Sequence, residues 1–181
     1  MHSLKEWATV VQALEAGEQT VLLRKGGILE AASGFVVESK RFLLFPTFEH
    51  QSPENIKPQY HKYLDFVRGH KPTEGQNDIT SYAEVMAEAD ITSEDKINKL
   101  SEFHIWSDSY IKTRRNWMPQ KAMKAVFLKT YKLEKFGTPL KPEYQGCKSW
   151  IDINANIESG KPVLSESEIM SRLKKFQEIV N

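Results

Sequence analysis

Two short apolar runs constrain the fold of this chain more than any other feature of its sequence. One covers Thr20–Arg24 and the other Phe42–Phe45, and polar or turn-forming residues follow each run at once. Runs of β-branched, aliphatic or aromatic residues bounded by glycine or proline are typical of β-strands. We therefore predict two strands that leave polar side chains at their ends, where binding groups are commonly mounted on a rigid scaffold: Arg24, Lys25, Glu49, His50 and Gln51.

Apolar spacing and helix-start signals predict the remaining elements. Helices are expected over Leu4–Leu14 and Tyr60–Arg68, and after the N-cap residues Ser93, Ser107 and Ser165, the last of which begins a capping box with Glu168. Strands are expected over Ala125–Leu133 and Ser149–Ile153, with Phe35–Val37 as a hairpin partner of Phe42–Phe45. The alternation in Tyr82–Ile91 favours a strand, although its Ala, Glu and Met residues also suit a helix.

Helices that flank short, non-repeating strands predict an α+β fold rather than a series of βαβ units. A length of 181 residues predicts one domain over 1–181, built as a compact unit of short mixed strands flanked by helices. By fold-level analogy, this order would also suit a small PUA-like β-barrel, a kind of fold that binds RNA or modified bases. Seven apolar positions on the predicted strands should share a single core: Leu22, Leu23, Phe42, Leu44, Val126, Leu128 and Trp150.

Bulk properties place the chain among cytoplasmic soluble proteins. Its single cysteine, Cys147, rules out an internal disulfide framework and fits a reducing compartment. No stretch approaches the ~18 apolar residues that span a bilayer, and the first residues lack the apolar core of a signal peptide. We expect no membrane association.

The formal net charge of +1 hides an uneven distribution along the chain. Residues 74–102 hold eight acidic residues against two lysines, whereas residues 110–135 hold eight Lys and Arg against one Glu. Such segments either pair with each other in the fold or leave one basic face that can meet a polyanion.

Three segments carry a resemblance to a known family: Leu22–Ile28, Phe42–Gln51 and Tyr144–Trp150. In combination they resemble the domain of unknown function 1802 family of bacterial proteins, over nearly the whole chain. The resemblance implies one domain and no assigned activity. It also implies a DNA-related or defence-related context, because some relatives are associated with restriction-endonuclease-like domains, although we expect no such domain within these 181 residues.

The sequence predicts no catalytic residues, metal site or cofactor. Glu38-Ser39-Lys40 matches half of a restriction-type nuclease motif, but no aspartate precedes it. The five histidines and Cys147 lack the short spacing of zinc ligands. If the protein nevertheless acts on a small ligand, His50 and Glu49 are the acid and base candidates.

The strongest binding signal lies after Ser107, where basic and aromatic residues alternate. Tyr110, Arg114 and Trp117 fall on one helix face, and Lys112, Arg115 and Lys121 flank them. Phosphate-binding cations interleaved with aromatic rings are typical of single-strand or flipped-base recognition. In the alternative interpretation, the two aromatic residues belong to the core, Arg114 stacks on one of them, and the cations pair with the acidic segment.

We therefore predict a non-catalytic module that binds single-stranded or distorted nucleic acid. Its binding residues would be Arg24, Lys25, His50, Gln51, Tyr110, Lys112, Arg114, Arg115, Trp117 and Lys121. The alternatives are a protein-interaction or regulatory subunit, whose polarised charges meet a partner protein, and the small-ligand enzyme.

Overall fold

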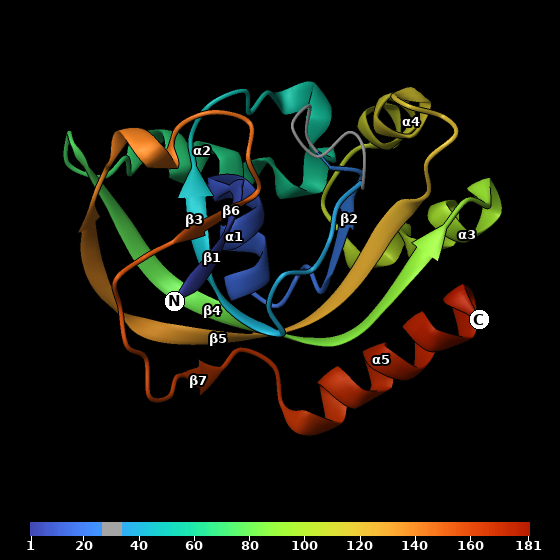
Figure 1. Ribbon diagram of the computed structural model, residues 1–181. Helices are drawn as coiled ribbons and strands as arrows, with labels where there is room; N and C mark the ends of the chain where they lie inside the picture. Colours follow the sequence, from blue (N-terminus) through green and yellow to red (C-terminus); the bar gives the residue numbers. More distant parts are fainter. Residues whose placement is uncertain (27–33) are drawn as a thin grey trace.

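A curved mixed β-sheet organises the chain in the computed structural model, which describes residues 1–26 and 34–181 (Figure 1). Its strands follow the order β2-β5-β4-β3-β1-β6, and β7 pairs with β5 outside this path. β1 and β3 are parallel, and the other pairs are antiparallel. The strands are β1 His2–Trp7, β2 Val21–Arg24, β3 Arg41–Thr47, β4 Gln76–Ile91, β5 Met123–Pro139, β6 Trp150–Asp152 and β7 Lys161–Pro162.

The two longest strands, β4 and β5, form the curved backbone of the sheet. Their register shifts between Ile79 and Ser81 and again between Val85 and Ala87. Irregularities of this kind bend a strand and increase its twist, which accounts for the curl of β4 and β5 around the other strands in Figure 1.

Helices cover the sheet and its ends, so the predicted α+β class is confirmed. The helices are α1 Ala8–Glu15, α2 His61–Gly69, α3 Glu94–Lys99, α4 Asp108–Asn116 and α5 Glu166–Val180, with single 3₁₀ turns at Pro53–Asn55, Pro58–Tyr60, Leu100–Phe103 and Pro142–Tyr144. The three predicted N-caps are confirmed, because the hydroxyls of Ser93, Ser107 and Ser165 accept backbone hydrogen bonds from the first turns of α3, α4 and α5. Ser165 and Glu168 form the expected capping box.

Alternate side chains of β3 point to opposite faces of the sheet and enter two apolar clusters. Phe42 and Leu44 lie in the larger cluster, whereas Leu43 and Phe45 lie in the smaller one. All seven residues predicted to share a core belong to the larger cluster, so that prediction is confirmed. The strand prediction for Tyr82–Ile91 is also confirmed, since these residues lie within β4.

Two predicted elements are wrong. The first half of the expected helix Leu4–Leu14 is β1, which pairs with β3 on one side and β6 on the other. Apolar residues at helical spacing favour a helix only weakly, and pairing with a strand on each side outweighs that preference. Phe35–Val37 forms no strand, and β3 pairs instead with β1 and β4. Phe35 packs against Trp150, with ring centroids 6.0 Å apart.

Within the described residues, no helix combines the length and the apolar character that crossing a membrane would require.

Candidate nucleic-acid interface

The end of β2 meets helix α4, which brings together two predicted binding segments that are far apart in the sequence. Arg114 Nη2 donates a hydrogen bond of 3.3 Å to the carbonyl of Gly26, and Lys25 Nζ donates to the carbonyl of Arg115. Gly26 has a φ of +86°, a left-handed conformation that glycine adopts without steric cost. The side chain of Lys25 is only 2% exposed, and its burial, with Arg114 and Arg115 nearby, lowers the pKa of this lysine.

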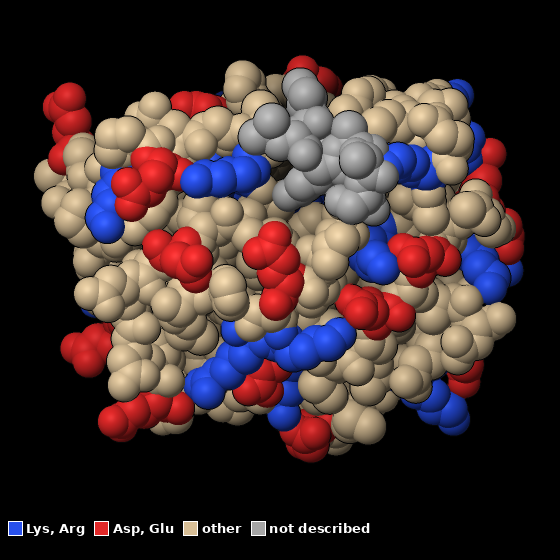
Figure 2. All heavy atoms as spheres, in the orientation of Figure 1, with Lys and Arg blue, Asp and Glu red and all other residues tan. Residues whose placement is uncertain are grey.

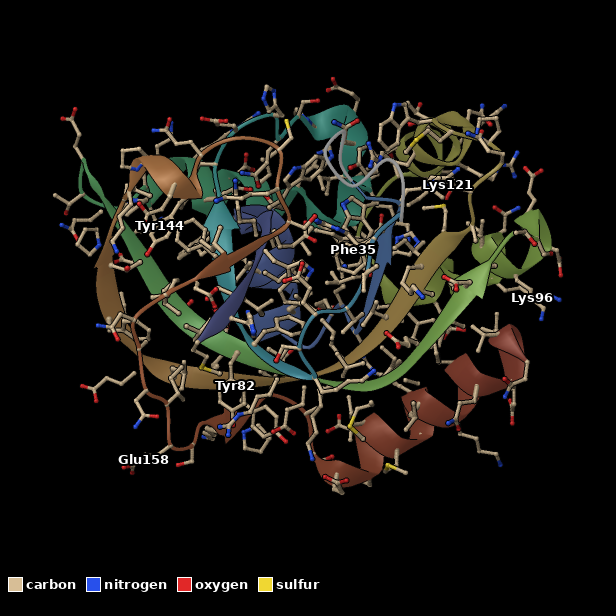
Figure 3. All side chains as sticks on the ribbon, in the orientation of Figure 1. Phe35, Tyr82, Lys96, Lys121, Tyr144 and Glu158 are labelled. Atoms are coloured by element: carbon tan, nitrogen blue, oxygen red, sulfur yellow. The ribbon has the colours of Figure 1, made fainter. Side chains whose placement is uncertain are left out.

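Arg24, the preceding residue, is committed to contacts inside the protein. Its guanidinium donates to Glu6 Oε2 at 2.9 Å and to Ser149 Oγ at 2.8 Å. It also lies 5.1 Å from the centre of the Phe35 ring, which Figure 3 shows beside β2. Glu6 belongs to β1 and Ser149 directly precedes β6, so these contacts join the two ends of the sheet path through side chains.

Tyr110 lies among aromatic rings and is partly buried. Its ring centroid is 5.0 Å from that of Trp7 and 6.3 Å from that of Trp106. Burial raises the pKa of Tyr110, and the charges of Arg114 and Arg24 partly offset this shift. Because Tyr110 is only partly buried, it belongs neither wholly to the core nor wholly to the surface.

The rest of α4 presents cations with different partners. Arg114 stacks over the ring of Trp117 at 5.0 Å, whereas Arg115 forms an ion pair of 2.6 Å with Glu94 of α3. Lys112 is exposed, and Lys121 lies partly exposed in the turn beyond α4, where Figure 3 labels it.

The loop after β3 serves another part of the fold. Gln51 Oε1 accepts hydrogen bonds from the backbone N–H and the hydroxyl of Thr9, in the first turn of α1. Gln51 therefore caps the start of α1. Glu49 and His50 are exposed, and His50 has a φ of +59°, which is unusual for a residue other than glycine. In the described part of the chain, no hydrogen bond or ion pair joins Glu49 to His50.

The acidic and basic segments of the sequence partly neutralise each other. Besides the pair of Arg115 with Glu94, Lys124 of β5 pairs with Asp90 of β4 at 2.9 Å. Figure 2 shows the consequence on one face, where basic and acidic side chains are interspersed. The positive charge of residues 110–135 therefore does not form one continuous basic face on this side.

Residues 3–175 match the domain of unknown function DUF1802. The chain belongs to the DUF1802 family. A comparison with curated proteins finds no match.

Solved structures of the ASCH protein from Zymomonas mobilis resemble this DUF1802 chain at low similarity. The protein itself shares 11% identity, with 96% of this chain and 92% of the other covered and a TM-score of 0.42. Two single-residue mutants of it share 12% identity with TM-scores of 0.41, covering 96% of this chain and 93% and 95% of theirs. At this level the similarity says nothing of what the DUF1802 chain binds.

Sequence reasoning missed several residues that shape this interface. Glu6 and Trp7 were assigned to a helix, and no local signal showed that β1 would carry them to the end of β2. The buried residues His104 and Trp106 lie just before α4, and only their apolar neighbours Phe103 and Ile105 hinted at burial. Within the described residues of this DUF1802 chain, no group of three His, Cys, Asp or Glu side chains is suited to hold a metal ion.

Proposed function

We propose that this DUF1802 protein is a non-catalytic module that binds single-stranded or distorted nucleic acid along helix α4. The observation that carries the proposal is how Arg114 is held. Its guanidinium donates to the carbonyl of Gly26, which carries no formal charge, so this hydrogen bond does not neutralise the cation. Buried Lys25 adds positive charge near Arg114, and exposed Lys112 adds a cation on the same helix as Arg114.

Aromatic rings lie beside these cations, which supports a polynucleotide as the ligand. Trp117 lies under Arg114, and the partly exposed rings of Tyr110 and Trp7 are in contact with each other. Cations that meet phosphates and rings that stack on bases are the two components of sequence-tolerant single-strand binding. The context suggested by family resemblance, DNA-related or defence-related, agrees with such a ligand.

The proposal is tested by the anisotropy of a labelled single-stranded oligonucleotide of about a dozen nucleotides, as DNA and as RNA. Affinity should fall steeply between about 50 and about 200 mM salt, because binding releases counterions. Arg114→Ala should weaken binding and reduce the salt slope by about one. Lys132→Ala, an exposed lysine on β5, is the matched control with the same change in net charge and should leave binding unchanged.

A protein-interaction or regulatory subunit is the second candidate. The pairing of Arg115 with Glu94 and of Lys124 with Asp90 favours it, because paired charges are less available to phosphates. Absence of binding to either oligonucleotide at low salt would reject the first proposal in favour of this one.

A further inference from the structure

A small cavity lies between helices α3 and α4. Its volume is about 30 Å³, and both helices and the segment joining them contribute to its lining. Ile97 from α3 and Ile111 from α4 supply apolar walls. Three polar residues also line the cavity: Asn98, Ser101 and His104.

His104 is the unusual member of this lining. Its side chain is 1% exposed, and neither ring nitrogen makes a well-formed hydrogen bond with a described residue, although the backbone of Trp106 lies near enough to interact weakly with the imidazole. Buried polar atoms in folded proteins are nearly always paired, so an imidazole with two unpaired nitrogens calls for an explanation. A neutral imidazole offers one donor and one acceptor, which is the pattern that a hydrogen-bonding ligand can complete.

Four charged residues belong to the lining of this cavity. The ion pair of Glu94 with Arg115 crosses from α3 to α4, and Asp108 and Lys112 lie one turn apart on α4. The two carboxylates disfavour an anion inside the cavity, whereas exposed Lys112 can meet a phosphate outside it. A neutral polar group attached to an anionic backbone fits this arrangement.

We propose that the α3–α4 cavity receives the hydrogen-bonding edge of an unpaired nucleobase from a strand bound along α4. The edge would lie between Ile97 and Ile111 and reach Asn98 and His104, while Lys112 contacts the adjoining phosphate. A volume of about 30 Å³ has room for about one or two groups of the size of a water molecule, so only a polar group at the edge of the base would enter, and the ring would remain outside. This inference rests on the proposed nucleic-acid binding, and it adds a contact with the base itself.

The test compares two labelled oligonucleotides that share one backbone, one carrying bases and the other abasic. The protein should bind the base-bearing strand about tenfold more tightly, and Asn98→Ala should remove most of that preference. The same variant should leave the affinity for the abasic strand unchanged. Asn98 is exposed on α3, so its truncation does not threaten folding. Asn156→Ala, at another exposed position, is the matched control.

A second readout follows the imidazole directly. The ¹⁵N resonances of His104, assigned with the His104→Gln variant, should shift when the base-bearing strand binds and stay in place with the abasic strand. Equal affinity for both strands, or unmoved His104 resonances at saturation, would overturn the pocket assignment while leaving nucleic-acid binding intact. Failure of both strands to bind at low salt would overturn both proposals.

Discussion

The guanidinium of Arg24, at the end of β2, forms an ion pair of 2.9 Å with the carboxylate of Glu6 on β1. The side chains are 21% and 4% exposed, so most of this pair is shielded from water. β2 is one end of the sheet path, and β1 lies next to the strand at the other end. No described strand pairing joins β2 to β1 or β6, so this ion pair connects the two ends of the curled sheet.

Removal of one partner should destabilise the protein, because the other charge stays buried without its counterion. We expect Arg24→Ala to lower the free energy of unfolding by about 3 kcal/mol, measured by urea denaturation. Lys40→Ala breaks an exposed pair with Glu88 and should cost less than about 1 kcal/mol. Equal losses from the two substitutions would show that the Arg24 pair has no special role in closing the sheet.

The contacts of Arg24 also explain what sequence reasoning could and could not reach. Helix starts at Ser93, Ser107 and Ser165 were predictable, because an N-cap is satisfied within four residues of its own position. The strand at Leu4–Trp7 was not predictable, because it forms by pairing with β3 and β6. These strands lie about 40 and about 150 residues further along the chain.

The candidate interface also combines contacts that are local in sequence with contacts that depend on the tertiary fold. The stacking of Arg114 on Trp117, which the alternative interpretation of the sequence expected, joins residues only three positions apart. The assignment of Gln51 as a cap for Thr9 and of Lys25 as a buried donor to Arg115 required the tertiary fold. Polar residues at strand ends look alike in sequence, whether they face a ligand or another part of the chain.

Truncation of Leu128 tests the larger apolar cluster. This residue of β5 is fully buried, so Leu128→Ala should lower the free energy of unfolding by about 2–5 kcal/mol, the range for a cavity left in a packed core. Leu140→Ala is the matched control, because Leu140 is 50% exposed and leaves no enclosed cavity. A similar loss at both positions in denaturant titrations would contradict the assignment of Leu128 to the core.

Acid should destabilise the fold through His104. Burial, with the Lys57 ammonium nearby, lowers the pKa of this imidazole from 6.5 to about 3. Between these values the unfolded chain binds a proton that the folded chain does not, so stability is lost as the pH falls. The loss attributable to His104 should reach about 2 kcal/mol between about pH 7 and about pH 5.

Denaturant titrations across this pH range measure that loss, and His104→Gln should flatten the dependence. His50→Gln removes an exposed histidine and is the matched control. A pH dependence that survives in the His104 variant would assign the effect to other groups.

Trp117→Ala should affect nucleic-acid binding differently from Arg114→Ala. Loss of a stacked base should weaken binding by roughly 1–3 kcal/mol while leaving the salt slope nearly unchanged, because no phosphate contact is removed. Trp117→Phe keeps an aromatic face and should retain most of the affinity. Trp117 is also partly buried beneath Arg114, so thermal melting of each variant must accompany the binding titrations. A lowered melting temperature with unchanged affinity would make Trp117 a packing residue, and the stacking contribution would then have to come from Tyr110 or Trp7.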